Sequence, residues 1–94
     1  MVATMIIHQT IIISGKVQGV YYRASAKQKA EALNLTGFAQ NLPNGNVLIE
    51  AEGNETSLKE FINWCRRGSA NALVENVEVK TDLVKGYLSF SIKR

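Results

Sequence analysis

The sequence predicts an α+β fold in which two helices cover one face of an antiparallel sheet. Short runs with the length and composition of strands alternate with two segments that carry apolar residues at helical spacing. Their order along the 94 residues is strand, helix, strand, strand, helix, strand, with one more strand at the end. A proline-asparagine-glycine sequence joins the two central strands, as expected for a tight hairpin.

The first predicted strand runs from Ile6 to Ser14 and is mostly apolar and β-branched. His8 lies near its start, and no carboxylate or nucleophile in the local sequence is placed to orient the ring. We therefore expect a strand-end side chain and not a catalyst. The first helix is expected to begin near Tyr22 and to end at Asn34. Its apolar residues recur at helical intervals at Tyr22, Ala26, Ala30 and Leu33.

Two strands joined by a hairpin are expected over Thr36 to Asn41 and over Asn46 to Glu52. Pro43 presets φ for a turn, and the following Asn44-Gly45 pair tolerates positive φ. Apolar and polar residues alternate in the second strand, which predicts one core face and one mostly polar face. The core face carries Val47, Ile49 and Ala51, and the other carries Leu48, Glu50 and Glu52.

The second helix is expected to begin after the capping residue Asn54 and to end near Arg67, just before Gly68. Arg66 and Arg67 lie in its last turn, where positive charge complements the helix dipole. Its core residues are Leu58, Phe61, Ile62 and Cys65. We expect Cys65 to act as a small buried hydrophobe and not as a nucleophile.

The third extended region runs from Val74 to Lys80 or Asp82, and Lys85-Gly86 then turns the chain. A last strand over Tyr87 to Ile92 is expected to place Leu88, Phe90 and Ile92 on one face. This order is that of the ferredoxin-like split β-α-β-β-α-β sandwich, with an extra C-terminal strand. Residues 1–94 are expected to form a single domain.

Charge and cysteine content limit the possible partners. The net charge of +3 and the pI near 9.2 suit a small anionic ligand and do not by themselves indicate nucleic acid. Cys65 is the only cysteine, so no internal disulfide is possible, which fits a reducing compartment. No apolar run approaches the length of a membrane span. We therefore expect a cytoplasmic monomer without membrane or nucleic-acid partners.

The loop from Ser14 to Arg23 joins the first strand to the first helix and contains Gly15 and Gly19. Glycine permits the required backbone angles, and the first helical N–H groups have no partner within the helix. The helix dipole and these donors favour an anion, and the Arg23 guanidinium matches a phosphate or a carboxylate. These features predict an oxyanion-binding loop, although an ordinary surface connection between a strand and a helix has the same composition. The glycine spacing excludes a Walker loop and a dinucleotide fingerprint.

Asn41 is the second candidate. In the split fold the first two strands run parallel with one strand between them, so their C-terminal ends reach the same end of the sheet. Asn41 should then lie near the loop, where its amide can both donate and accept and so can hold a water. The residues alone equally allow an asparagine that only opens the hairpin before Pro43.

The segment from Ile13 to Arg23 is similar to the pattern V-x-G-x-V-Q-G-V-x-F-R, which is the signature of the acylphosphatase family. Ala30-x-x-Leu33-x-Leu35-x-Gly37 and Asn41-x-x-x-Gly45 follow at that family's spacing, and the resemblance covers nearly the whole chain. The chain departs from the family pattern with Tyr22 for phenylalanine, Asn44 for aspartate, Ser69 for proline and Phe38-Ala39-Gln40 for Trp-Val-Arg.

This resemblance implies an enzyme that hydrolyses the carboxyl–phosphate bond of acylphosphates, without a metal, a cofactor or a covalent intermediate. Carried over by position, Arg23 would bind the phosphoryl group and Asn41 would position the attacking water. The backbone of the loop would surround the phosphate, with Gln18, Gly19, Val20, Tyr21 and Tyr22. An acylphosphate has a good leaving group, so orientation and charge neutralisation suffice without a strong base.

Two alternatives stay open. One is a non-catalytic phosphate- or anion-binding module, such as the acylphosphatase-like domains inside larger carbamoyl-transferring maturation enzymes, and it would bind phosphate without hydrolysis. The other is an RNA-binding domain, because RNA-recognition folds share the element order. The strand from Val47 to Glu52 lacks the aromatic pair on which bases stack and carries Glu50 and Glu52, which disfavours RNA.

Overall fold

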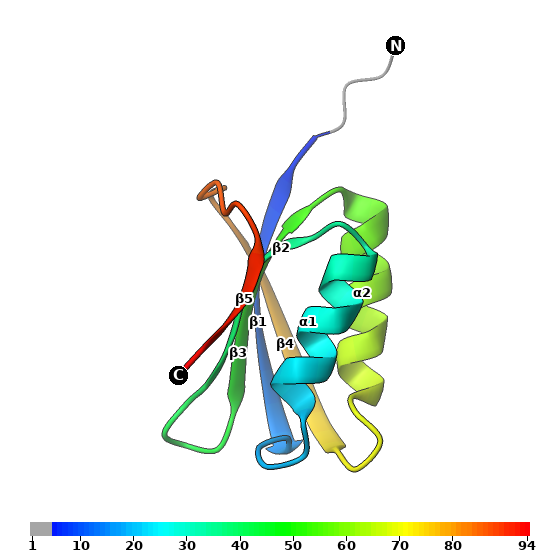
Figure 1. The fold of residues 1–94 in the computed structure, drawn as a ribbon, viewed down its shortest axis with the longest axis vertical. Coiled ribbons are helices and arrows are strands. Elements are labelled where there is room, and N and C mark those ends of the chain that lie inside the picture. Colours follow the sequence, from blue (N-terminus) through cyan, green and yellow to red (C-terminus); the bar gives the residue numbers. More distant parts are fainter. Residues whose placement is uncertain (1–4) are drawn as a thin grey trace.

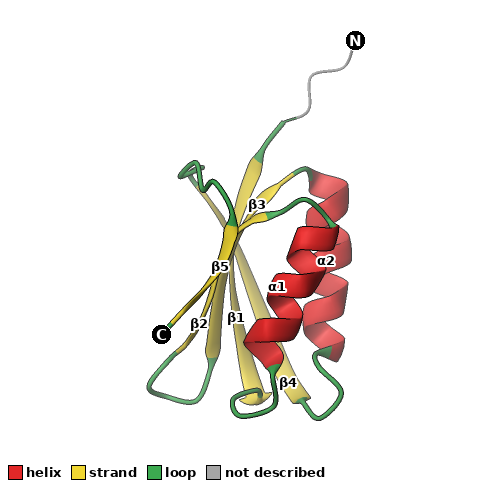
Figure 2. Ribbon diagram, in the orientation of Figure 1, coloured by secondary structure: helices red, strands yellow, loops and turns green. Residues whose placement is uncertain are grey.

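The computed structural model describes residues 5–94 and shows a five-stranded sheet with both helices packed on one face (Figures 1 and 2). The elements along the chain are β1 (Ile7–Lys16), α1 (Tyr22–Ala32), β2 (Thr36–Asn41), β3 (Val47–Gly53), α2 (Glu55–Arg67), β4 (Leu73–Asp82) and β5 (Phe90–Lys93). The strand order in the sheet is β4-β1-β3-β2-β5. The expected α+β, ferredoxin-like arrangement is therefore confirmed.

The four strands of the split motif pair as the sequence predicts. β1 lies between β4 and β3 and is antiparallel to both, and β3 is antiparallel to β2. β1 and β2 are consequently parallel with β3 between them. Their C-terminal ends lie at the same end of the sheet, where the β1–α1 loop and the β2–β3 hairpin are seen in Figure 1.

The last strand makes the sheet mixed. β5 pairs in parallel with β2, with Gly37 opposite Phe90 and Gln40 opposite Lys93. Because β4 and β5 occupy opposite edges, residues 83–89 must cross from one edge of the sheet to the other. Phe90 fixes β5 against the helices through an edge-on contact with Phe61, with ring centroids 6.2 Å apart.

The predicted extent of this last strand was wrong at its start. β5 begins only at Phe90, and Leu88, which was expected on the same face as Phe90, is 98% exposed whereas Phe90 is buried. The reason is a tertiary contact: the backbone N–H groups of Lys85, Gly86 and Tyr87 donate to the Glu52 carboxylate. This contact holds the chain over the open face of the sheet before it reaches β2.

The core lies between the sheet and the two helices and follows the predicted alternation. The helix-facing residues of β1 and β3 have no exposed surface: Ile11, Ile13, Val47, Ile49 and Ala51. The small Ala26 and Ala30 of α1 are also fully buried and let that helix lie close to the strands. Cys65 is buried as expected, and burial raises the pKa of its thiol to about 12, so the thiol stays protonated at neutral pH.

The ends of α2 also agree with the sequence. The side chain of Asn54 accepts a hydrogen bond from the Ser57 N–H at 2.8 Å, which caps the first turn. Arg66 and Arg67 occupy the last turn, and Gly68 follows with φ of 75°. The Tyr22 hydroxyl donates to the Cys65 carbonyl at 2.7 Å, so the start of α1 is joined to the end of α2.

Candidate active site

The loop between β1 and α1 turns sharply through two residues in the left-handed region. Gly19 has φ of 74°, and no heavy atom lies within 4 Å of the place a Cβ would take. Tyr21 has φ of 59°, which costs a non-glycine residue about 1 kcal/mol or more. Such strain is common where a backbone is shaped for binding.

The N-terminus of α1 offers unpaired donors. Tyr21 occupies the N-cap position, but its side chain accepts no hydrogen bond from the first turn. The Ser25 N–H donates to the Tyr21 carbonyl at 3.0 Å. The N–H groups of Tyr22, Arg23 and Ala24 precede this bond and therefore have no partner within the helix. The first turn carries no acidic residue that would neutralise the partial positive charge of the helix end.

These elements surround a hollow of about 450 Å³. Its walls come from the loop and the first turn of α1, from the end of β2 and from the end of β5. The lining residues are Val17, Gly19, Tyr21, Tyr22, Arg23, Ala24, Asn41, Ile92 and Arg94. The helix N-terminus and two arginine residues thus border one small cavity, and this combination favours an anion.

Arg23 is anchored by the last strand. Its Nη1 donates to the Lys93 carbonyl at 3.1 Å. This contact uses one of the five N–H donors of the guanidinium and restricts the side chain beside the hollow. The strand pairing of β5 therefore bears directly on the position of Arg23.

Asn41 reaches the same hollow from β2. Its Oδ1 is buried and has no hydrogen-bond partner within residues 5–94. An unsatisfied buried acceptor costs about 1–3 kcal/mol, so such groups are few, and Gln9 Oε1 is the other one in the described residues. A small movement of the Asn41 side chain would bring its Oδ1 within reach of a water molecule in the hollow.

The structure brings together most of the residues expected at the site. Arg23 and Asn41 share the hollow with Gly19, Tyr21 and Tyr22, whereas Gln18 and Val20 do not line it. The side chain of Val20 is in the core, 6% exposed, and its carbonyl accepts a hydrogen bond from Ser69 Oγ at 2.7 Å. Gln18 points its side chain toward the β2–β3 hairpin.

Sequence reasoning missed the contribution of the C-terminal end to this site. Ile92 and Arg94 line the hollow because β5 pairs beside β2. The sequence did offer a signal for this contribution. Every second residue of a strand lies on the same face, so Ile92 and Arg94 should share the face of Phe90.

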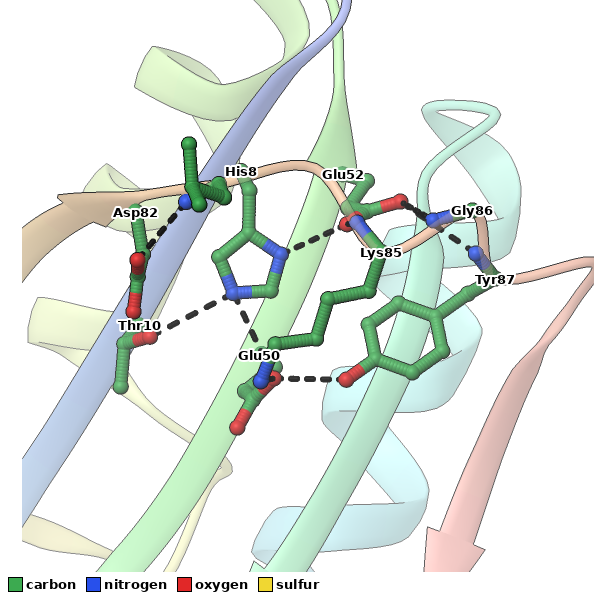
Figure 3. A network of polar contacts seen from close by, with 9 residues as sticks. His8, Thr10, Glu50, Glu52, Asp82, Lys85, Gly86 and Tyr87 are labelled. Atoms are coloured by element: carbon green, nitrogen blue, oxygen red, sulfur yellow. Dashed lines mark hydrogen bonds and ion pairs between the residues drawn. The ribbon is translucent and has the colours of Figure 1, made fainter.

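A second polar cluster lies at the opposite end of β1 (Figure 3). His8 is fully buried, with Nδ1 at 2.7 Å from Glu52 and Nε2 at 3.4 Å from Glu50. The local sequence contains no carboxylate that orients His8, as expected. In the folded chain, however, the β1–β3 register places His8 opposite Glu52. His8 is nevertheless far from the hollow, since the hollow lies beyond the other end of β1.

Glu52 fastens the connection between β4 and β5. It accepts from the backbone N–H groups of Lys85, Gly86 and Tyr87 at 2.5, 3.0 and 3.3 Å (Figure 3). Burial acts to raise the pKa of Glu52, but these donors and His8 outweigh it and hold the pKa below the usual range. The carboxylate therefore stays ionised at neutral pH.

Glu50 completes the cluster on the same face of β3. It accepts from the Tyr87 hydroxyl at 2.6 Å and from Lys85 Nζ at 3.2 Å. Burial acts to raise the pKa of Glu50, and these two partners hold it below its ordinary value. Burial and the neighbouring Glu50 raise the pKa of the Tyr87 phenol to about 12.

Within residues 5–94, no group of three or more histidine, cysteine, aspartate and glutamate side chains is arranged to hold a metal ion. The helices of this part of the chain are too short or too polar to cross a membrane.

Comparisons with known proteins agree with this geometry. Residues 9–92 match the family model described as Acylphosphatase. An acylphosphatase from Marinobacter nauticus is 54% identical over 67 residues, which cover 71% of this chain and 73% of that protein. One from Methylococcus capsulatus is 44% identical over 85 residues, covering 89% and 92%. The solved structure of an acylphosphatase from Coxiella burnetii superposes with a TM-score of 0.91 at 36% identity, covering 94% of this chain and 93% of that one.

Proposed function

The chain belongs to the acylphosphatase family and is an enzyme of that family, and we propose that its reaction takes place in the hollow between the β1–α1 loop and Asn41. The substrate is a small acylphosphate, which is hydrolysed to a carboxylate and inorganic phosphate. One observation carries this proposal: Arg23, the N-terminus of α1 and Asn41 from a different strand line the same cavity.

Arg23 and the loop backbone bind the phosphoryl group. The guanidinium supplies charge-assisted hydrogen bonds, each worth about 1.5–3 kcal/mol. The N–H groups of the loop from Gln18 to Tyr22 and of the first helical turn add fixed dipoles. Together they neutralise the charge that spreads over the phosphoryl oxygens in the transition state.

Asn41 orients the attacking water. A bond forms between the water oxygen and phosphorus, while the bond from phosphorus to the carboxyl oxygen breaks and its electron pair leaves on the carboxylate. A carboxylate is a stable leaving group, so water needs correct placement more than strong activation by a base. The amide oxygen of Asn41 can accept a hydrogen bond from that water and so hold the water oxygen toward phosphorus.

The test compares Arg23→Ala and Asn41→Ala with the control Arg66→Ala, which removes an exposed arginine at the end of α2. Hydrolysis of a generic aromatic acylphosphate is followed by absorbance, with inorganic phosphate as inhibitor. Both site variants should lose about a hundredfold or more in kcat/KM. Arg23→Ala should also weaken inhibition by phosphate, and Arg66→Ala should resemble the wild type.

Near wild-type turnover by either site variant, in a folded protein, would reject these roles. Phosphate binding without any hydrolysis by the wild type would instead support the non-catalytic binding module. The cytoplasmic location and the monomeric state stay predictions, and size-exclusion chromatography with light scattering tests the latter.

A further inference from the structure

We propose that Gln18 is a positioning residue that holds Asn41 at the correct distance from the bound phosphoryl group. Its side chain ties the β1–α1 loop, which binds phosphate, to the β2–β3 hairpin, which begins directly after Asn41. This inference rests on the proposed role of Asn41, and it gives the glutamine side chain a task separate from that of its backbone N–H.

The geometry of the Gln18 amide is specific for the hairpin. Its Nε2 donates to the Leu42 carbonyl at 2.8 Å and to the Asn46 carbonyl at 2.9 Å. The Leu42 N–H donates to the same Asn46 carbonyl at 2.8 Å, so these two residues close the base of the turn. One side-chain amide thus uses both of its N–H groups to hold the two ends of a single turn.

Asn41 depends on this connection because its own side chain has no anchor in the described chain. Its Oδ1 has no partner within residues 5–94, and its backbone pairs with Val47 of β3, which pairs in turn with Ile13 of β1. In the same part of the chain, no hydrogen bond other than the two from Gln18 joins residues 17–21 to residues 42–46. Beyond this pairing within the sheet, the Gln18 side chain is therefore the direct link that holds the phosphate loop against the hairpin that follows Asn41.

This spacing matters for the chemical step more than for phosphate binding. The water must lie in line with the bond that breaks, and a displacement of about 1 Å can cost on the order of a hundredfold in rate. Phosphate itself is held by Arg23 and by the loop backbone, which a change in the Gln18 side chain leaves in place. Loss of the connection should consequently lower kcat and leave phosphate affinity nearly unchanged.

The experiment uses Gln18→Met, which keeps the length of the side chain and removes both donors, and Gln18→Glu, which places carboxylate oxygens against the two carbonyls. Gln28→Met is the matched control, because Gln28 is exposed on α1. We expect kcat to fall by about tenfold or more in both Gln18 variants. In Gln18→Met, which adds no charge, the inhibition constant of inorganic phosphate should stay within about twofold of the wild type, as for unchanged phosphate contacts.

A double-mutant cycle separates positioning from general destabilisation. In the Asn41→Ala background, Gln18→Met should cause no further loss, because the group it positions is absent. NMR provides a second readout: backbone amide shifts of residues 42–46 should change in Gln18→Met, while phosphate-induced shifts at Gly19 and Tyr21 persist.

Three results would overturn the inference: wild-type kcat in folded Gln18→Met, an equal loss in the Asn41→Ala background, or a parallel loss of kcat and phosphate affinity. If Asn41→Ala is impaired and Gln18→Met is not, this inference alone fails. If Asn41→Ala itself turns over like the wild type, the proposed role of Asn41 fails and takes this inference with it.

Discussion

At the scale of single residues, Ser69 shapes the loop that binds phosphate although it does not line the hollow. Its Oγ donates to the Val20 carbonyl at 2.7 Å. The C=O and N–H of a trans peptide point in opposite directions, so this contact also fixes the direction of the Tyr21 N–H. Sequence comparison had shown Ser69 only as a departure from the family's proline.

Ser69→Ala should weaken binding of inorganic phosphate by about fivefold, because a side-chain hydrogen bond contributes about 1 kcal/mol. Ser69→Thr keeps a hydroxyl and should bind like the wild type. The inhibition constant of phosphate checks both variants. Unchanged inhibition in Ser69→Ala would show that the loop keeps its shape without this contact.

At the scale of elements, the start of α2 depends on a side-chain cap. Asn54→Ala removes the acceptor for the Ser57 N–H and should lower the free energy of unfolding by about 1 kcal/mol. Asn54→Ser retains a capping oxygen and serves as the control. Urea denaturation measures the effect, and kcat should be unchanged, because Asn54 does not line the hollow.

The elements were predictable to the extent that their signals are local. Helical spacing, the capping Asn54 and the hairpin residues located α2, β2 and β3. The start of β5 was not predictable, because Glu52 holds the preceding chain from a strand more than thirty residues away. Arg23 and Asn41 could be placed together once the split topology was recognised, since that topology alone brings their elements to one end of the sheet.

Contacts between distant side chains left no such local signal. Gln18 reaches Asn46 across 28 residues, Ser69 reaches Val20 across 49, and His8 reaches Glu52 across 44. Each of these pairs depends on strand register and loop shape, which are set by the complete packing and not by the nearby sequence.

At the scale of the whole molecule, the cluster around Glu52 should make stability depend on pH. The pKa of Glu52 is lowered in the folded state from an ordinary value of 4.5, so the unfolded chain binds more protons on acidification. The contribution of the ionised Glu52 to the free energy of unfolding is complete above pH 4.5. It is lost as the pH falls through the lower pKa of Glu52 in the folded state.

Glu52→Gln should therefore lower the free energy of unfolding at pH 7, on the order of 3 kcal/mol for a broken buried network. It should also lose less stability than the wild type between pH 5 and pH 3, since the titrating group is gone. Urea denaturation across this range measures both effects. Glu31→Gln, at an exposed position of α1, is the control and should follow the wild-type profile.

The hollow is built from segments that lie far apart in the sequence, and this has a consequence for the order in which it forms during synthesis. A ribosome makes the phosphate loop and Asn41 about fifty residues before it makes the Lys93 carbonyl that anchors Arg23 and the wall formed by Ile92 and Arg94. Catalytic competence is thus expected to arise in one step, when β5 emerges and docks beside β2, and not to grow gradually with the nascent polypeptide.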